Sequence, residues 1–282
     1  MTDYPLVWHK KLPGQTPEQE EASLRLLQMP VGSVQPRRAA RAVDRLLPAA
    51  RAVLDEAVAG LRRHAEGAPG SDRISLRGLG DEDRAVVLDI LGEGDVWAHV
   101  GGPVAYEISE SVLPGLWYIQ ATAQDGSRNE WLEVGDVPEV VRQAAERMTS
   151  DTIAIPDSLP PGSMNAHALL TELLERSSAY RPGEENHVIN FTLLPITEAD
   201  AEVLTTVLGQ IPVLIRGGGY GSCRIFATGL RHVWAVQYLN SMSKVILDTL
   251  EIGGVPVAAL AAREDLAESA ARLPEMMQAY AS

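Results

Sequence analysis

Residues 208–237 read LGQIPVLIRGGGYGSCRIFATGLRHVWAVQ, and this stretch occurs twice in the chain. The earlier copy, LGEGDVWAHVGGPVAYEISESVLPGLWYIQ, covers residues 91–120 and aligns without a gap at an offset of 117. The two copies carry the same residue at nine of thirty positions. After one inserted residue, the match resumes between Leu132–Pro138 and Leu250–Pro256. Self-similarity of this length predicts a duplicated domain.

The same order of elements is expected around each copy. Apolar spacing predicts helices over residues 38–65, 81–91, 165–178 and 198–208. A short strand in HVINFTLLPI is expected between the last two of these helices. Three β-prone runs then follow in each copy, near 95–100, 105–110 and 116–123, and near 212–216, 223–227 and 232–239. A further strand, WLEV or DTLEI, leads through Val-Pro into an alanine-rich helix.

This order predicts an α+β fold of two tandem duplicated α/β units, each a mostly antiparallel sheet packed with helices. We expect an N-terminal arm over 1–37, a first unit over 38–150, a linker over 151–164 and a second unit over 165–282. The arm carries one helical patch, TPEQEEASLRLLQM. Pro48 falls within the predicted helix 38–65, so a kink or a break is expected there.

Composition narrows the range of partners. The formal charge of -14 and the pI near 4.9 disfavour nucleic acid as a partner, because nucleic-acid sites need clustered basic residues. An acidic surface instead favours basic peptides or metal ions, or serves solubility alone. The single Cys223 excludes an internal disulfide and a CxxC site. No apolar run of about eighteen residues is present and the N-terminus has no signal-peptide core, so we expect a cytoplasmic protein without membrane insertion.

The glycines at 217, 218, 219 and 221 form the most conspicuous loop. A phosphate-binding loop needs a helix to begin directly after it, so that backbone N–H groups and the helix dipole face the anion. Here the β-prone SCRIFAT follows, and there is no GK[ST] motif. The pattern favours a turn between two strands.

Cys223 is open to two interpretations. A thiolate is a nucleophile and a soft metal ligand, which makes the residue a candidate functional thiol. Its counterpart in the earlier copy is Tyr106, however, and a lone cysteine in a strand is more often a small buried hydrophobic residue.

Trp117 and Trp234 occupy the same repeat position, as do Gln120 and Gln237. The interpretation favoured for both pairs is structural: a tryptophan that anchors each core, and a glutamine that satisfies polar groups across the sheet.

The copies differ most in charge. Arg216, Arg224 and His232 stand where the earlier copy has His99, Glu107 and Gly115, which predicts a local positive patch on an acidic protein. No serine elbow, HExxH or paired-histidine motif accompanies His232, so the sequence indicates no enzyme. The resulting candidate partner-binding residues are Arg216, Tyr220, Cys223, Arg224, His232, Trp234 and Gln237.

Several stretches carry a resemblance to a known family. RGGGYGSCRI, the run from HVWAVQYLN to AARL, GDVWAHVGG and SVLPGLWYIQ resemble the HupH/HyaF proteins, accessory factors for uptake [NiFe] hydrogenases, over roughly residues 70–275. The resemblance implies a non-enzymatic accessory protein or chaperone without a cofactor. It implies binding of the iron–sulfur small-subunit precursor before export, together with a thioredoxin-like companion of the HupG/HyaE type. Acidic faces are expected to meet basic parts of the precursor, including its twin-arginine leader.

One alternative stays open at this point. The chain could be a metal- or cofactor-binding enzyme, or an iron–sulfur assembly factor that uses Cys223.

Overall fold

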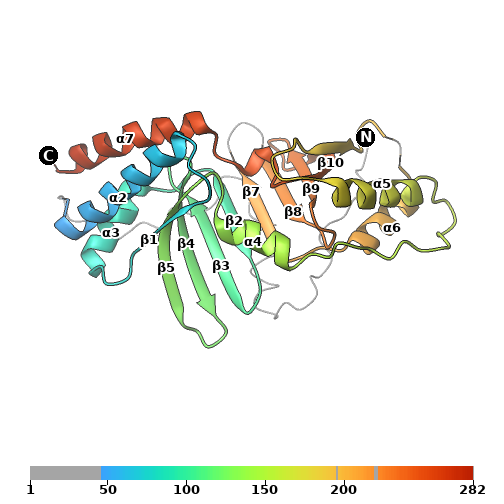
Figure 1. The fold of residues 1–282 in the computed structure, drawn as a ribbon, viewed down its shortest axis with the longest axis horizontal. Coiled ribbons are helices and arrows are strands. Elements are labelled where there is room, and N and C mark those ends of the chain that lie inside the picture. Colours follow the sequence, from blue (N-terminus) through green and yellow to red (C-terminus); the bar gives the residue numbers. More distant parts are fainter. Residues whose placement is uncertain (1–45, 195, 219–221, 282) are drawn as a thin grey trace. The chain divides into compact units, whose positions relative to one another are not determined.

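The computed structural model describes residues 46–194, 196–218 and 222–281, which divide into two compact units (Figure 1). The first unit, called the α2 unit here, contains residues 46–99, 103–140 and 260–281. The second, called the α5 unit, contains residues 100–102 and 141–259. The predicted arm, including its helical patch, lies outside the described residues.

The α2 unit is a sheet with helices packed on it. Its strands follow the order β1-β5-β4-β3-β2, and the pairs β1–β5, β3–β4 and β4–β5 are antiparallel. The elements in chain order are α2 (Pro48–Ala65), β1 (Asp72–Ser75), α3 (Asp81–Leu91), β2 (Val96–Val100), β3 (Val104–Glu110), β4 (Leu116–Ala123), β5 (Arg128–Val134) and α7 (Arg263–Ala281).

Two helix termini in this unit follow from single residues. Pro48 is the first residue of α2 rather than a kink within it, because a proline lacks only an N–H that has no helical partner at this position. The part of the predicted helix before residue 46 lies outside the described residues. Helix α3 ends as predicted at Gly92, whose φ of 56° favours glycine.

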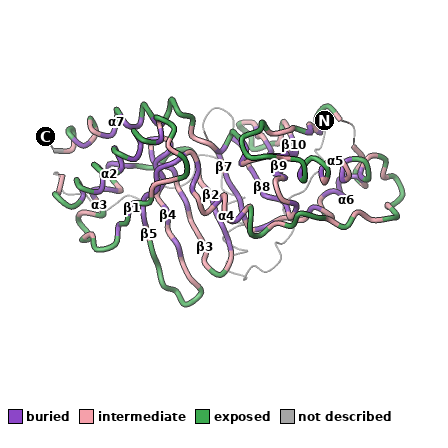
Figure 2. The backbone as a smooth tube through the Cα atoms, viewed as in Figure 1, coloured by how far each residue is buried: buried purple, intermediate pink, exposed green. Residues whose placement is uncertain are grey.

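The core of the α2 unit lies between α2, α3, α7 and one face of the sheet. Figure 2 shows buried positions along the inner sides of these helices. Leu54 and Leu61 of α2, Leu132 of β5 and Leu273 of α7 are all fully buried. The C-terminal helix therefore completes the core of a unit whose other elements all precede residue 141.

The α5 unit has strand order β7-β8-β9-β10-β6, again with antiparallel pairs. Helices α5 and α6 contact each other, and α5 contacts β10. The elements are α4 (Glu139–Arg147, in this unit from Val141), α5 (Ala166–Ala179), β6 (His187–Asn190), α6 (Glu198–Leu208), β7 (Val213–Gly217), β8 (Ser222–Ala227), β9 (Val233–Leu239), β10 (Val245–Ile252) and η1 (Val257–Ala259).

Asp200 joins the starts of α5 and α6. Its Oδ1 accepts hydrogen bonds from Ser163 Oγ and from the N–H groups of Met164, Asn165 and Ala166, at 2.7–2.9 Å. Together with Thr197 it also forms the capping box of α6. Burial acts to raise the pKa of Asp200, but these hydrogen bonds outweigh it and hold the pKa well below its usual range.

The α+β class and the antiparallel pairing are confirmed, and the two units repeat one order of helix, strand, helix and four strands. One local prediction is wrong: after Val255-Pro256 the chain forms the 3-10 turn η1, and the long helix begins only at Arg263. Duplication and the repeat boundaries 38–150 and 165–282 stay predictions. Each compact unit combines stretches from both sides of residue 140.

Candidate functional site

A row of polar side chains crosses the sheet of the α2 unit. Directly opposed residues of antiparallel strands project their side chains on the same face. Glu107 of β3 lies opposite Gln120 of β4, which lies opposite Glu130 of β5. His99 of β2 extends the row, since its Nδ1 is 2.9 Å from Glu107 Oε1. These four residues are called the acidic row.

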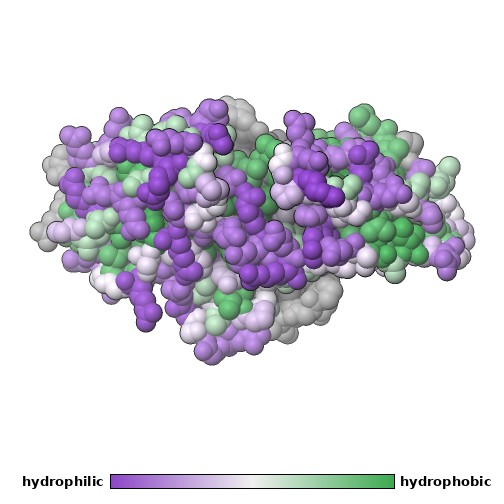
Figure 3. Space-filling model, viewed as in Figure 1, coloured by the Kyte–Doolittle hydropathy of each residue, from purple (hydrophilic) through white to green (hydrophobic). Residues whose placement is uncertain are grey.

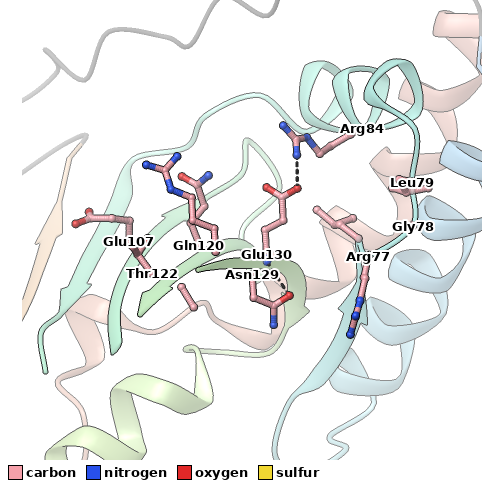
Figure 4. Close-up of a pocket in the computed structure, with 12 residues that line it drawn as sticks. Arg77, Gly78, Leu79, Arg84, Glu107, Gln120, Thr122, Asn129 and Glu130 are labelled. Atoms are coloured by element: carbon pink, nitrogen blue, oxygen red, sulfur yellow. Dashed lines mark hydrogen bonds and ion pairs between the residues drawn. The ribbon is translucent and has the colours of Figure 1, made fainter. Parts of the chain in front are cut away.

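Both carboxylates of the acidic row have polar partners. Arg84 Nη1 donates to Glu130 Oε1 at 2.7 Å, and Tyr118 Oη donates to Glu130 Oε2 at 2.5 Å. Figure 4 shows the Arg84 side chain of α3 reaching toward Glu130. A guanidinium group and a hydroxyl group thus each donate to one of the two carboxylate oxygens of Glu130.

The acidic row borders a pocket of about 740 Å³. Its walls are the segment after β1, α3, and the strands β3, β4 and β5 (Figure 4). The lining combines apolar, amide, hydroxyl and charged groups: Leu76, Arg77, Gly78, Leu79, Arg84, Glu107, Gln120, Ala121, Thr122, Arg128, Asn129 and Glu130.

The α5 unit carries a row at the same sheet position but with different charges. Arg216 of β7 lies opposite Arg224 of β8, which lies opposite Gln237 of β9, which lies opposite Asp248 of β10. These four residues are called the arginine row. Burial lowers the pKa of both guanidinium groups, and for Arg216 the charge of Arg224 adds to the effect.

Asp248 keeps the position of Glu130 but lacks its partners. The positions of Arg84 and Tyr118 correspond to the buried Ala201 and Ala235. Gln237 Nε2 donates to Asp248 Oδ2 at 3.3 Å, whereas Oδ1 has no hydrogen-bond partner among the described residues. Burial raises the pKa of Asp248 to about 7, which the bond from Gln237 only partly opposes.

The structure brings three of the predicted site residues together. Arg216, Arg224 and Gln237 belong to the arginine row, with both arginines half-buried and Gln237 buried. Cys223 and Trp234 lie on the opposite face of the same sheet. Cys223 directly precedes Arg224 on β8, and Trp234 is three residues before Gln237 on β9. Side chains an odd number of positions apart on a strand point to opposite faces. Tyr220 lies outside the described residues.

Two of the predicted partner-binding residues, Trp234 and Cys223, are buried in the core. Trp234 is 3% exposed, and its counterpart Trp117 is fully buried with its Nε1 donating to Gly135 O at 2.9 Å. Cys223 is also buried, and this burial raises the pKa of its thiol. A raised pKa disfavours the thiolate that nucleophilic attack or metal binding requires. No group of three metal-ligating side chains converges anywhere in the described part of the chain.

His232 occupies the turn before β9. Its φ of 60° is in the left-handed region, and its backbone oxygen accepts from Gly253 N at 2.7 Å. The ring centroid lies 4.8 Å from that of Tyr180. Burial, followed by the charge of Arg231, lowers the pKa of His232, so the ring is neutral at neutral pH.

Sequence reasoning missed Asp248, Glu130 and the pocket. The one-residue insertion after residue 120 aligns Glu130 with Asp248, so the repeat could have shown that both copies place a carboxylate there. Nothing in the sequence could have shown which partner each carboxylate finds. That depends on Arg84, which lies on a helix 46 residues away in sequence.

Comparison with known proteins identifies relatives. The model of the HupH hydrogenase expression protein, C-terminal conserved region, matches residues 47–157 and again 163–280. The hydrogenase expression/formation protein HupH of Rhizobium leguminosarum bv. viciae is 40% identical over 71% of each chain. HupH of Rhodobacter capsulatus is 41% identical over 80% of each chain. The hydrogenase-1 operon protein HyaF of Escherichia coli (strain K12) is 36% identical over 73% of this chain and 72% of its own.

A solved structure is also similar. The hydrogenase expression protein HupH from Thiobacillus denitrificans ATCC 25259 is 28% identical and covers 41% of this chain and 97% of its own, with a TM-score of 0.38. Among residues 46–194, 196–218 and 222–281, no helix combines the length and apolar character that a membrane crossing requires.

Proposed function

Because the chain belongs to the HupH family of hydrogenase expression proteins, we propose that it is a non-enzymatic binding protein in hydrogenase maturation. Its partner in this proposal is the iron–sulfur small-subunit precursor, which it holds before export in cooperation with a thioredoxin-like companion of the HupG/HyaE type. The names of the relatives support the hydrogenase maturation role. The binding role is argued below from the surface of the α5 unit.

The distribution of exposed apolar side chains carries this proposal. Among the described residues, every exposed large hydrophobic residue belongs to the α5 unit: Met148, Met164, Val188, Leu193, Met242, Ile246 and Val257. Figure 3 shows hydrophobic surface over the region of α5 and α6 among hydrophilic side chains. Exposed apolar groups favour protein contacts, and methionines adapt to differently shaped partners. The α5 unit is therefore the proposed partner-binding unit.

Charge supports the same proposal. A chain with a net charge of -14 attracts basic segments, and a twin-arginine leader combines basic and apolar residues. Within the α5 unit, the half-buried Arg216 and Arg224 supply the opposite charge and are proposed contacts for an acidic group of the partner.

The apolar contribution can be tested at one hairpin. Met242 lies between β9 and β10 and is 80% exposed, so Met242→Asp should not disturb the core. We expect the affinity for purified small-subunit precursor to fall roughly tenfold, as for an interface residue worth about 1–2 kcal/mol. Gln124→Asp, in the equivalent exposed hairpin between β4 and β5, is the control and should bind like the parent. Equal affinity of both variants would remove Met242 from the interface.

The electrostatic contribution predicts a salt dependence. Affinity for the leader-bearing precursor should fall as the salt concentration rises, and should be lower for a precursor without its leader. If affinity were unchanged by salt or by deletion of the leader, acidic faces would not be the binding surface for the leader.

The arginine row needs its own variant. A folded Arg216→Glu, Arg224→Glu double variant should recover less precursor in a pull-down, because both proposed contacts reverse their charge. Far-UV circular dichroism establishes that the variant is folded. Undiminished recovery by a folded variant would place the arginine row outside the interface.

A further inference from the structure

The first turns of α7 dock on a turn of the α2 unit, residues 111–115 between β3 and β4. Leu266 of α7 packs so closely against Gly115 that a Cβ at this position would overlap its side chain. Ser269 Oγ, three residues later on α7, donates to the Pro114 carbonyl oxygen at 2.9 Å. Leu266 belongs to the buried core of the unit, so this contact closes one end of that core.

A buried carboxyl group holds the turn. Glu110, the last residue of β3, is 6% exposed, and its Oε1 accepts from the Gly115 N–H at 3.0 Å. Gly94 N donates to the backbone oxygen of Glu110 at 2.8 Å. The side chain of Glu110 thus bonds to the residue on which Leu266 packs. A change in its charge acts directly on the surface that receives α7.

The charges that act on Glu110 have the same sign as its own. Asp265, in the first turn of α7, and Asp95, in the segment before β2, both disfavour a negative charge on Glu110. The guanidinium group of Arg263, the first residue of α7, lies against Gly67 instead. Ionisation of Glu110 therefore places like charges on the two sides of the contact between α7 and the turn.

Across the sheet, the neighbour of Glu110 is uncharged. Glu110 lies opposite Trp117 of β4, which lies opposite Glu133 of β5. The two oxygens of Glu133 accept from Trp131 Nε1 and from the Glu139 N–H, so this carboxyl group is held two strands away. Asp265 is thus the acidic group that α7 itself brings to Glu110.

The protonation of Glu110 and the docking of α7 are linked. Burial raises the pKa of Glu110 from 4.5 to about 7 against the opposing effect of the Gly115 N–H, and the charges of Asp265 and Asp95 add to the rise. If release of α7 lets water reach the carboxyl group, its pKa returns toward 4.5. The docked form is then most favoured below pH 4.5 and loses this advantage as the pH rises to about 7.

Pro274 divides α7 into two parts. It lies inside the helix and lacks the N–H group that would bond to the Ala270 carbonyl oxygen. The part before it contacts the 111–115 turn, and the part after it contributes the buried Met277 to the core. In Figure 1, α7 lies along α2, which it contacts. The first part can therefore leave the turn while the second part stays packed.

We propose that residues 263–273 form a pH-sensitive strap, which stays docked on the 111–115 turn while Glu110 is protonated and is released more readily once Glu110 is charged. The corresponding turn of the α5 unit has Ala227 in place of Glu110 and His232 in place of Gly115, so it lacks both the carboxyl group and the glycine. The proposal concerns the α2 unit alone and does not rest on the proposed function.

Hydrogen–deuterium exchange of the full chain, followed by mass spectrometry of peptides within residues 263–273, tests the strap. At each pH the exchange rate of the parent is divided by that of Glu110→Gln, because the intrinsic exchange chemistry of these peptides is the same in both proteins and cancels. Glutamine keeps an acceptor for the Gly115 N–H. Between pH 5.5 and 8.5 the ratio should rise by about fivefold to thirtyfold, the larger value applying if release restores a pKa of 4.5.

Two further variants separate local release from global unfolding. Asp248→Asn removes a buried carboxyl group with a similarly raised pKa from the α5 unit, and its ratio for the same peptides should not change with pH. Asp265→Asn keeps an acceptor for the Ala262 N–H and should slow exchange about twofold at pH 8.5 but not at pH 5.5. The proposal is overturned if the Glu110→Gln ratio is independent of pH, if Asp248→Asn gives the same rise, or if Asp265→Asn exchanges like the parent at pH 8.5.

Discussion

Replacing Asp248 by asparagine should stabilise the protein at alkaline pH. Asp248 is fully buried, its Oδ1 has no hydrogen-bond partner among the described residues, and burial raises its pKa from 3.8 to about 7. The folded state therefore binds this proton more tightly than the unfolded state does. Its contribution to stability is highest below pH 4, falls as the pH rises from about 4 to about 7, and is constant above that.

The magnitude follows from the pKa difference. Each pKa unit corresponds to about 1.4 kcal/mol, so the ionised Asp248 costs about 4 kcal/mol above pH 7. Asparagine has nearly the same shape and carries no charge, and its oxygen can accept from Gln237 Nε2. Between pH 5.5 and 8.5, the difference in the free energy of unfolding between Asp248→Asn and the parent should increase by about 2 kcal/mol.

Urea unfolding of both proteins at a series of pH values measures this difference, in which the titration of all other groups cancels. Glu130→Gln is the matched control, since it removes a carboxylate that Arg84 and Tyr118 hold. We expect this control to be less stable than the parent at pH 8.5. A difference for Asp248→Asn that does not change with pH, or a destabilised variant at pH 8.5, would refute the reasoning.

Three further predictions concern single residues. Asp200→Asn should lower the free energy of unfolding by about 3 kcal/mol at pH 7 in urea unfolding, because a charged acceptor shared by the starts of α5 and α6 is lost; because the pKa of Asp200 is lowered in the folded state, the parent has this contribution in full above about pH 4 and loses it progressively as the pH falls further. Glu110→Gln should show a similar increase of about 2 kcal/mol between pH 5.5 and 8.5 in the same assay, because burial raises the pKa of Glu110 to about 7 as well; its total gain at pH 8.5 should be smaller than that of Asp248→Asn, because the pKa of Glu110 rises from 4.5 rather than from 3.8. Cys223→Ala should leave the affinity for the small-subunit precursor unchanged, since the buried thiol is not part of the proposed surface; a loss of more than tenfold would revive a thiol-dependent function.

The sequence was sufficient for elements whose causes are local. The periodicity of residues 198–208 and the glycine at 209 predict α6 and its end, and the β-prone runs around the glycine loop predict the antiparallel pair β7–β8. At Pro48 the sequence predicts a kink or a break, because the apolar pattern continues on both sides of it, and in the structure α2 begins at this residue. A proline can begin a helix as well as interrupt one, and apolar periodicity does not distinguish the two.

What the sequence could not supply depends on contacts between distant segments. The membership of α7 in the α2 unit rests on packing of Leu273 and its neighbours against α2, more than 200 residues earlier, and no local pattern specifies it. The candidate site likewise depends on how separate strands pair with one another. The repeat aligns Arg216 and Arg224 with His99 and Glu107, but only the register of β7 and β8 shows that the two arginines lie directly opposite each other.

Co-purification from a hydrogenase-expressing cell, with bound proteins identified by mass spectrometry, tests whether the chain binds the small-subunit precursor. We expect the tagged chain to recover the hydrogenase small-subunit precursor with its leader intact, and Met242→Asp to recover less of it than Gln124→Asp does. Recovery of the large subunit without the small subunit, or equal recovery of the precursor by both variants, would refute binding of the precursor through the α5 unit.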